Sequence, residues 1–414
     1  MQNQPNLLIL GHSKFPFGSP AASRIRTIAK GLVEKGAKVH IIIPNRIALR
    51  EEDRTHSNQM CWQGITYESQ HQYNLQRNEN LSQLRRRWEN IKATIKTWKK
   101  VLILIKSGEF NNILIYSRSA ISLFPIVAIA HLYKASLFYD VVEWLPYQAF
   151  KLGWLNPLFY DDKLARYLPY LGCQGVIAIS EYIAQKYLKY QIPYIILPSI
   201  IDTSIIESLT TLDKQLKDNS NSQFTVIYAG KCKYGDGFDR LLNAVKIAHL
   251  KGCPIQLLVL GTDGLSGNSL KQRKICDQDN ILHSRVKFLG KVPDQNYFKT
   301  LNSANCLVLP RPKTQVVEAA FPTRLPEFLA TGRPVVTTNV PDIPRYLEAG
   351  IHAEIVSEDT SQALANGLLQ IWQNPQRAQE LGIAGQQKCY EVFDYRQHIE
   401  RLYQFLINSF DSIQ

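Results

Sequence analysis

Paired cysteines and long apolar segments are both missing from this 414-residue sequence. Its seven cysteines are scattered, odd in number and never arranged as C-x-x-C. This pattern argues against a zinc ribbon or a disulfide framework and favours reduced thiols in a cytoplasmic protein. The longest apolar run, AISLFPIVAIAHL, is too short to span a bilayer. We also expect no signal peptide, because PNLLILG lacks a basic lead. A soluble or peripheral cytoplasmic protein is expected.

Positive charge is concentrated in the first quarter of the chain. The net charge is +13, and residues 1–110 hold 18 Lys and Arg against 8 Asp and Glu. A basic excess confined to one region indicates an acidic partner, which is nucleic acid, a phosphorylated ligand or an anionic membrane. Nucleic acid is the weakest of these options, because no recognition motif accompanies the charge.

The order of apolar and amphipathic segments predicts two similar halves. LLIL (7–10) and KVHIIIP (38–44) are predicted strands on either side of a helix that Ser19 caps and Pro20 begins. Further buried strands are predicted at NILIYSR, ASLFYDVVE and GVIAIS, and then at FTVIYAG, IQLLVLG, VKFLG, CLVLP and PVVTT. Such alternation with helices is typical of doubly wound parallel sheets. The predicted fold class is α/β, with two Rossmann-like domains facing each other across a cleft.

A polar segment, DKQLKDNSNSQ (213–223), divides these halves and is predicted as a linker. Residues 1–212 would then form an N-terminal domain, and 224–395 a C-terminal domain. The amphipathic segment within 396–414 is expected to form a helix that could pack back on the first domain.

Several motifs carry a family resemblance. The second half contains VIYAGK, GFDRLLNAV, VKFLGKVP, NCLVLPRP and FPTRLPEFLATGRPVVTTNVPDIPRYL, and the first half GSPAASRIRTIAKGLVEKGAKVHIIIP, FYDVVEW, VIAISEYIAQKY and LPSIIDTS. Together and in this order they resemble the family-4 glycosyltransferases, which are retaining enzymes with the GT-B fold. The resemblance covers most of the chain. It implies transfer of a sugar from a nucleotide diphosphate donor, with no metal and no cofactor.

The resemblance assigns Glu327 to the two ribose hydroxyls of the donor. A carboxylate can accept two hydrogen bonds in parallel, which suits a vicinal diol. A short helix that begins near Glu327 would direct its first amides at the diphosphate. These are the amides of Thr323, Arg324 and Leu325. The backbone of Lys291 and Val292, after VKFLG, matches the loop that surrounds the base in relatives.

The phosphate-binding loop both follows and departs from the family pattern. Lys231 stands where relatives usually carry an arginine on the diphosphate, and a cation there would neutralise charge on the leaving nucleotide. Asp236 stands where many relatives have a lysine, and an acid pointing inward would repel a diphosphate. Either Lys233 takes over that role, or Asp236 faces solvent.

A second departure concerns the donor sugar. Many relatives have a glutamate eight positions before the one at Glu327, and this chain has Ala319 there. Glu318 could substitute only if the loop shifts. Sugar recognition would otherwise depend on the backbone of Ala320 and Phe321.

Two positions of the first half match acceptor-side landmarks. Gly18 lies in the loop that brings backbone close to the donor phosphate and acceptor in relatives, although a simple turn glycine is an equal alternative. Glu143 is the candidate acceptor-side catalytic residue, because Val142 replaces the histidine of relatives and only Asp140 is another acid nearby. A structural role for Glu143 is equally open.

Residues 81–106 predict one amphipathic helix. Apolar residues recur at alternating spacings of three and four: Leu81, Leu84, Trp88, Ile91, Ile95, Trp98, Leu102 and Ile105. The other faces carry a series of cations against the single acid Glu89: Arg85, Arg86, Arg87, Lys92, Lys96, Lys99, Lys100 and Lys106. The helix either packs on the first domain with a solvated basic face or attaches to anionic lipid.

These observations predict a metal-independent glycosyltransferase, a hexosyltransferase of polysaccharide or glycolipid biosynthesis. It would use a UDP-sugar and a saccharide or lipid-linked acceptor, in the cytoplasm or at the inner face of the membrane. Two alternatives remain. One is a UDP-sugar 2-epimerase of the same fold, which Val142 disfavours. The other is a partner protein that binds a nucleotide-sugar without turnover, as Asp236 and Ala319 would allow. The tripeptide DQD (277–279) matches a metal-binding motif of another glycosyltransferase fold, but we interpret it as surface loop.

Overall fold

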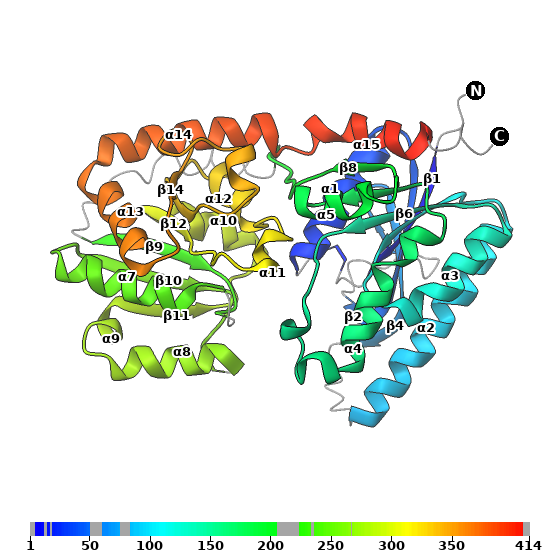
Figure 1. The fold of residues 1–414 in the computed structure, drawn as a ribbon, viewed down its shortest axis with the longest axis horizontal. Helices are drawn as coiled ribbons and strands as arrows, with labels where there is room; N and C mark the ends of the chain where they lie inside the picture. Colours follow the sequence, from blue (N-terminus) through cyan, green and yellow to red (C-terminus); the bar gives the residue numbers. More distant parts are fainter. Residues whose placement is uncertain are drawn as a thin grey trace. The chain divides into compact units, whose positions relative to one another are not determined.

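The computed structural model describes residues 5–11, 15–16, 19–49, 60–74, 83–204, 223–232, 236–265 and 267–408. The chain divides into two compact units (Figure 1). Unit 1 comprises Met1–Ile200 with Tyr395–Gln414, and unit 2 comprises Ile201–Asp394. Each unit contains one sheet of mainly parallel strands, which confirms the predicted α/β class with two Rossmann-like domains. The predicted linker at 213–223 lies, except for residue 223, outside the described residues.

The sheet of unit 1 has eight strands in the order β3-β4-β2-β1-β5-β6-β7-β8. Their bounds are β1 Asn6–Gly11, β2 Lys38–Leu49, β3 Met60–Trp62, β4 Ile65–Asn74, β5 Asn112–Tyr116, β6 Ser136–Val141, β7 Gly175–Ala178 and β8 Tyr194–Ile196. All neighbours pair in parallel except β3 and β4. This antiparallel hairpin was not predicted. Its two-residue turn, Gln63-Gly64, has φ values of 46° and 80°, which suit a tight hairpin.

Helices cover both faces of this sheet. They are α1 Pro20–Glu34, α2 Gln83–Lys106, α3 Ala120–Leu132, α4 Pro157–Ala165, α5 Glu181–Leu188 and α15 Arg396–Asn408, with short 3-10 turns η2 Tyr147–Ala149, η3 Gly153–Leu155 and η4 Leu168–Leu171. Ser19 caps α1 as predicted, because its Oγ accepts from the Ala22 amide at 3.1 Å. Leu7 and Ile9 pack with α1 and α15, and the alternate residues Leu8 and Leu10 are equally buried. Burial on both faces explains why β1 is continuously apolar.

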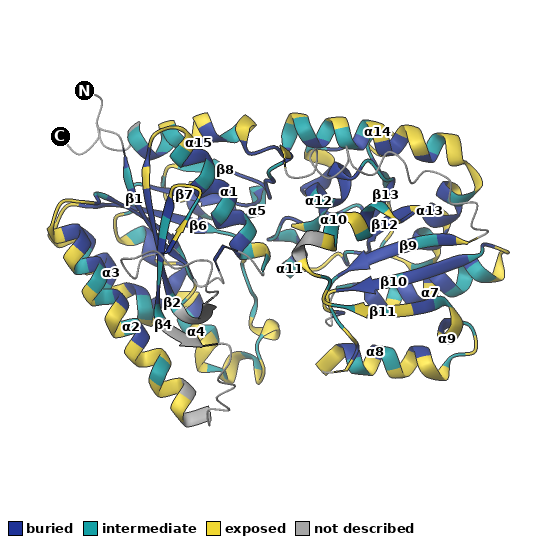
Figure 2. Ribbon diagram, turned by 180° about the vertical axis from the view of Figure 1, so that it is seen from behind, coloured by how far each residue is buried: buried dark blue, intermediate teal, exposed yellow. Residues whose placement is uncertain are grey.

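Unit 2 contains a fully parallel sheet of six strands in the order β11-β10-β9-β12-β13-β14. The strands are β9 Phe224–Ala229, β10 Ile255–Leu260, β11 Val286–Gly290, β12 Cys306–Leu309, β13 Val335–Thr338 and β14 Glu354–Val356. The helices are α7 Phe238–Leu250, α8 Gly267–Gln278, α9 Leu282–Arg285, α10 Asp294–Asn302, α11 Gln315–Glu318, α12 Arg324–Ala330, α13 Ser361–Gln373 and α14 Pro375–Val392, with a 3-10 turn η5 Ile343–Arg345. In both units the central strands are buried and the outer faces of the helices are exposed (Figure 2).

The strand order reverses direction once in each sheet. In unit 1 the reversal lies between β1 and β5, and in unit 2 between β9 and β12. Ligands of doubly wound sheets bind beyond the carboxyl ends of strands at such a reversal. A site is therefore expected near the segments that follow β1 and β5 in unit 1, and β9 and β12 in unit 2. Among the described helices, none combines the length and apolar character needed to cross a membrane.

Candidate functional site

The reversal point of unit 2 is built around a tightly closed loop. Lys231 follows β9 after one glycine and is exposed at the carboxyl end of the sheet. The loop ends at Gly237, which has φ +75° and would place a Cβ 1.6 Å from the Pro310 carbonyl oxygen, just after β12. Only glycine fits this conformation and this contact. The β9 loop and the end of β12 are thereby held together.

The unexpected acid Asp236 lies partly inside this loop. Asp236 is half-buried, and Lys233 lies outside the described residues. Burial raises the pKa of the Tyr228 hydroxyl well above its ordinary value, Asp236 raises it further, and Arg311 opposes the rise. Burial followed by Asp236 also raises the pKa of Cys232 to about 12. Asp236 and Arg311 therefore both lie close enough to affect Tyr228, and the positive charge of Arg311 opposes the effect of the negative charge of Asp236 there.

Helix α12 holds Glu327 in a compact polar group. Glu327 Oε2 accepts hydrogen bonds from Arg324 Nη1 at 2.6 Å and from Tyr297 Oη at 2.9 Å. Arg324 also donates to Tyr297 Oη at 2.8 Å, and its guanidinium lies 5.1 Å from the Tyr297 ring centroid. Among the described residues, no contact falls on Glu327 Oε1. One carboxylate oxygen is thus fixed by the protein while the other stays available to a ligand.

Burial and charge reinforce this arrangement. Burial, together with Glu327, raises the pKa of Tyr297 well above its ordinary value, so its hydroxyl stays a neutral donor. Burial alone would lower the pKa of Arg324, but Glu327 and Tyr297 raise it on balance. Tyr297 therefore stays neutral and Arg324 stays charged across the physiological pH range. Gly332, with φ +71°, then directs the chain out of the helix toward β13.

The amides proposed for the diphosphate lie at the start of α12. Leu325 N donates to the Pro322 carbonyl at 3.0 Å. The amides of Thr323 and Arg324 have no acceptor among the described residues, as expected for the first turn of a helix. Two of the three predicted amides are thus available to an anion.

In the segment before α12, some of the predicted sugar-site residues are buried in the core and others are partly exposed. Ala319 is fully buried, and Phe321 packs against Tyr346 and Phe393 at centroid distances of 5.5 and 5.6 Å. Any contact from Phe321 to a donor would therefore come from its backbone. Ala320 is half-buried, and Glu318, the last residue of α11, is also half-buried.

Lys291 and Val292 follow β11 at the same carboxyl edge of the sheet, with Lys291 exposed and Val292 half-buried. Asp279 of the DQD tripeptide accepts from Lys246 Nζ at 2.6 Å and from the Ile281 and Leu282 amides at 3.0 Å. These bonds give it a structural role at the start of α9.

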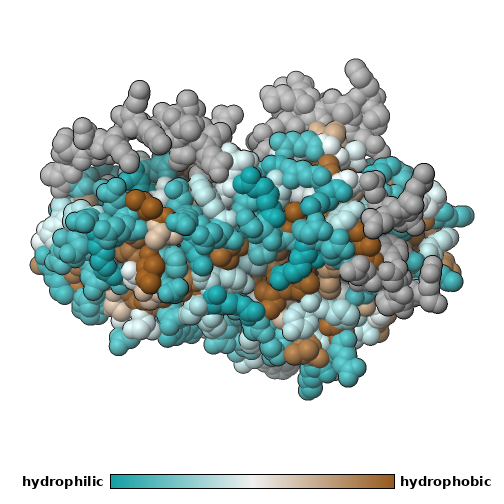
Figure 3. Space-filling view, turned by 90° about the horizontal axis from the view of Figure 1, so that it is seen from above, coloured by the Kyte–Doolittle hydropathy of each residue, from teal (hydrophilic) through white to brown (hydrophobic). Residues whose placement is uncertain are grey.

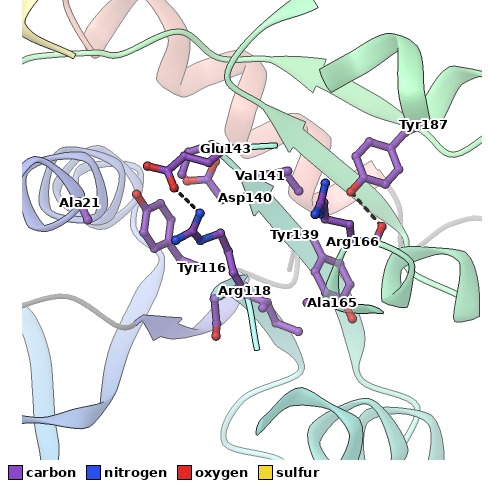
Figure 4. Close-up of a pocket in the computed structure, with 13 residues that line it drawn as sticks. Ala21, Tyr116, Arg118, Tyr139, Asp140, Val141, Glu143, Ala165, Arg166 and Tyr187 are labelled. Atoms are coloured by element: carbon purple, nitrogen blue, oxygen red, sulfur yellow. Dashed lines mark hydrogen bonds and ion pairs between the residues drawn. The ribbon is translucent and has the colours of Figure 1, made fainter. Parts of the chain in front are cut away.

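Unit 1 contains a pocket of about 210 Å³ at the carboxyl ends of β5 and β6 (Figure 4). The start of α1 closes one side through Ala21, and the α4 segment contributes Ala165 and Arg166. Tyr116 and Glu143 project toward each other at one end of the pocket (Figure 4). The predicted phosphate-loop residue Gly18 lies outside the described residues.

The two acids predicted near this pocket have different surroundings. Asp140 is buried and receives two bonds of 2.8 Å from Arg24 Nε and Nη2. Arg24 also donates to the Pro198 and Leu197 carbonyls at 2.8 and 3.1 Å. The pair of Arg24 and Asp140 thus connects α1, β6 and the segment after β8. Both carboxylate oxygens of Asp140 already accept a hydrogen bond from Arg24. Its role is structural.

Glu143, in contrast, is accessible. Its side chain is 47% exposed and pairs with Arg118, which also lies 3.7 Å from Asp162. Burial raises the pKa of Asp162, although Arg166 and Arg118 oppose this. Burial, followed by Asp140, raises the pKa of Tyr116. The pocket therefore presents paired charges and neutral hydroxyls, a combination that suits an uncharged polyhydroxylated ligand.

Sequence reasoning missed four residues of these sites: Arg24, Arg118, Tyr297 and Arg311. Tyr297 and Glu327 are 30 residues apart, and Arg24 and Asp140 are 116 apart. No local spacing indicates such pairs. An arginine two residues after a buried strand, as in Arg118 and Arg311, was the one available signal.

Comparison with known proteins shows likeness to glycosyltransferases. Residues 223–374 match the family model described as glycosyl transferases group 1. The amylovoran biosynthesis glycosyltransferase AmsK of Erwinia amylovora is 24% identical over 186 residues, which are 45% of this chain and 44% of that protein. The chain thus matches less than half the length of this relative. The match confirms the glycosyltransferase resemblance at the level of group 1.

Solved structures show the same fold over nearly the whole chain. The Anabaena protein HepE, in a complex with UDP and glucose, has a TM-score of 0.67 at 17% identity and covers 98% of this chain and 100% of its own. Sucrose-phosphate synthase from Thermosynechococcus elongatus has a TM-score of 0.68 at 18% identity, with 99% and 100% covered. The likeness establishes the GT-B fold.

Proposed function

We propose that this chain, whose residues 223–374 match the group 1 glycosyl transferases, is a retaining glycosyltransferase that uses a UDP-sugar. Its acceptor would be a saccharide or lipid-linked saccharide in polysaccharide or glycolipid biosynthesis. The observation that carries the proposal is the Glu327 carboxylate, which is fixed through Oε2 by Arg324 and Tyr297 and keeps Oε1 open. The UDP complexes of HepE support the choice of nucleotide.

In this proposal unit 2 holds the donor. Glu327 accepts the ribose hydroxyls, and the amides of Thr323 and Arg324 donate to the diphosphate. Lys231 neutralises charge on the departing nucleotide, assisted by Lys233. The backbone of Lys291 and Val292 contacts the base, and the Glu318–Phe321 segment contacts the sugar. These tasks need neither a metal nor a cofactor.

Unit 1 would hold the acceptor. The pocket of Tyr116, Arg118 and Glu143 presents hydrogen-bonding groups to sugar hydroxyls, and Glu143 is its accessible carboxylate. With a single accessible carboxylate in this pocket, a double displacement through a paired acid and nucleophile is disfavoured. We therefore assign Glu143 to orienting the acceptor and the leaving phosphate to accepting its proton.

The first experiment is a calorimetric titration with UDP, GDP, ADP and TDP, with magnesium and with chelator. We expect micromolar UDP binding that does not depend on metal. Glu327→Gln should weaken UDP binding at least about tenfold, because charge-assisted hydrogen bonds to the ribose are lost. Glu354→Gln is the matched control. Glu354 pairs with Arg377 at 3.0 Å, and its side chain is 15% exposed against 14% for Glu327, but it lies at the amino end of β14.

Equal UDP affinity for both variants would remove the ribose assignment. Turnover is tested separately by NMR of UDP-sugar hydrolysis. The first-formed sugar anomer should match that of the donor if configuration is retained. Binding without any hydrolysis or transfer would favour a nucleotide-sugar-binding partner, and a 2-epimer product would favour an epimerase.

A further inference from the structure

Helix α2 packs on unit 1 mainly through a face that its apolar spacing did not indicate. The buried side chains of this face are those of Ala93, Thr97, Val101 and Leu104, which follow one another at about one helical turn. Ile105, at the end of the predicted stripe, is also buried. Helix α2 lies against β2, β4 and α3, and the Trp98 indole donates to the Ser122 carbonyl of α3 at 2.8 Å. The helix is therefore anchored without the apolar residues of its first half.

The large apolar residues in the first half of α2 point away from the sheet. Trp88 is 59% exposed, Ile91 51% and Ile95 40%. Their spacing of three and four places them on one face, nearly opposite the buried face of Ala93 and Thr97. Leu81 lies outside the described residues, and the side chain of Leu84 is not described. The predicted stripe is real, but its first half does not pack on the domain.

Cations line this exposed stripe. Arg85, Lys92, Lys96 and Lys99 are all exposed on the same side of the helix. The acid Glu89 pairs with Lys92 at 3.2 Å, and Lys96 and Lys99 have no ion pair among the described residues. An apolar stripe bordered by Lys and Arg is the pattern of helices that lie in a membrane interface.

A second group of exposed apolar residues lies near α4, which packs against α3. Trp154, Leu155 and Leu158, around η3 and the start of α4, are 62 to 65% exposed. Asp161 of α4 accepts from the Ile121 amide at the start of α3 at 2.9 Å, and α3 contacts α2. Ile121 itself is exposed between them. In Figures 1 and 2, the first turns of α2 and helix α4 lie at the same end of unit 1, away from α15.

Figure 3 shows another view of the surface. In this view the described surface is mostly hydrophilic, and hydrophobic side chains form small separate groups. The exposed stripe of Trp88, Ile91 and Ile95 on one face of α2 is an apolar patch of the kind that marks an interaction site.

We propose that this end of unit 1 binds an anionic phospholipid bilayer. The lipid-docking surface consists of Trp88, Ile91, Ile95, Ile121, Trp154 and Leu158, with the α2 cations at its border. Trp and aliphatic side chains enter the boundary between headgroups and acyl chains, while Lys and Arg contact the negative headgroups. A second copy of the chain is disfavoured as the occupant, because it would bring two sets of α2 cations together.

The test is co-sedimentation of the full chain with vesicles, without nucleotide. We expect binding to vesicles of phosphatidylcholine with about one-third phosphatidylglycerol, and at least tenfold weaker binding to phosphatidylcholine alone. Trp88→Ser with Ile91→Ser and Ile95→Ser should weaken partition at least tenfold. Lys92→Gln with Lys96→Gln and Lys99→Gln should weaken it several-fold and reduce its salt dependence. Trp154→Ser with Leu158→Ser should also weaken it.

The controls carry the same changes in unit 2. Leu250→Ser with Ile351→Ser and Ile383→Ser replaces equally exposed apolar residues, and Lys271→Gln with Lys274→Gln and Lys287→Gln replaces equally exposed cations. Both should leave vesicle binding unchanged. Equal binding by the α2 variants and their controls would overturn the proposal, as would no binding by the unchanged protein. Sedimentation velocity measures the oligomeric state of each variant. If the unchanged protein is a dimer, and the α2 variants are monomers with unchanged vesicle binding, the surface would bind a second copy instead.

Because this assay needs no donor, its outcome is independent of the proposed transferase activity. UDP titration of each variant shows that unit 2 is intact.

Discussion

The two units share one architecture but differ in their surfaces. Each has a parallel sheet between helices, with a single reversal of strand order. Among the described residues, nineteen of the exposed large hydrophobic side chains belong to unit 1 and six to unit 2. The polar group around Glu327 belongs to unit 2. A Rossmann-like core therefore fixes where a ligand can bind, and the residues outside the core decide what binds there.

The largest effect is expected from breaking the buried pair that organises unit 1. Arg24→Ala leaves Asp140 charged and buried, which should cost about 3–5 kcal/mol of the free energy of unfolding of unit 1. Adding Asp140→Asn should restore part of this loss, because it removes the uncompensated charge. Urea unfolding measures both variants. UDP binding by unit 2 should survive, and its loss along with the stability of unit 1 would contradict independent units.

Arg26→Ala is the control for this variant. Arg26 lies on the same helix, is half-buried and donates from Nη1 to the Pro16 carbonyl at 3.2 Å. Its replacement should cost much less than that of Arg24, because its described contacts are with the neutral Pro16 carbonyl, the Ser23 hydroxyl and the Trp62 ring.

A corresponding break in unit 2 is expected at Gly237. Gly237→Ala requires a left-handed conformation and places Cβ against the Pro310 carbonyl oxygen, which should cost about 2–5 kcal/mol. UDP binding should fall with stability, while vesicle binding through unit 1 should persist. Gly252→Ala is the control, because Gly252 has φ +85° but a Cβ added there would meet no atom within 4 Å. Similar losses in both variants would show that strain, and not the contact with Pro310, matters.

A smaller effect sharpens the assignment of the donor site. Tyr297→Phe removes the hydroxyl that donates to Glu327 Oε2, so Glu327 is less firmly oriented. We expect UDP binding to weaken by about 0.5–1.5 kcal/mol, or roughly two- to tenfold. In a double-mutant cycle with Glu327→Gln, the second change should add little. Full additivity would mean that Tyr297 acts on the ligand independently of Glu327.

The smallest effect concerns Asp279, on the outer face of unit 2. The hydrogen bond from Lys246 lowers the pKa of Asp279. A lowered folded-state pKa means that the carboxylate stabilises the fold above its unfolded pKa, and that this stability is lost as pH falls through the folded pKa. Asp279→Asn keeps a helix-capping side chain and removes the charge, so it should cost at most about 1 kcal/mol at pH 7. Urea unfolding at pH 7 and near pH 3 should show the difference shrinking at the lower pH. A difference independent of pH would contradict the role of the charge.

Much of this molecule was predictable because its signals are local. The strands at LLIL, FTVIYAG and CLVLP, and the cap of α1 by Ser19, follow from apolar runs and capping chemistry within a few residues. The GT-B fold followed from the order of such motifs. The hairpin of β3 and β4 was missed because β3 has only three residues and lies at the edge of the sheet.

The candidate sites were predictable only in part. The acids Glu327 and Glu143 could be selected from their motifs, but their partners could not. Tyr297 comes from α10 and Arg118 from the end of β5, far from these acids in the sequence. From the sequence, Glu143 was the candidate and Asp140 was the only other acid nearby. In the structure, Arg24 pairs with Asp140, and Glu143 is accessible.

The sequence by itself determined the two α/β cores, because burial on both faces of a parallel sheet requires continuous apolar strands wherever they occur. It also predicted one helix over 81–106 with an apolar stripe and a basic border, and α2 spans Gln83–Lys106. Only the tertiary structure decided which side of that helix is buried. Helical periodicity specifies which residues share a face, but the choice of face depends on the neighbouring surface. Here small side chains at Ala93 and Thr97 allow close packing, and Trp88, Ile91 and Ile95 remain outside.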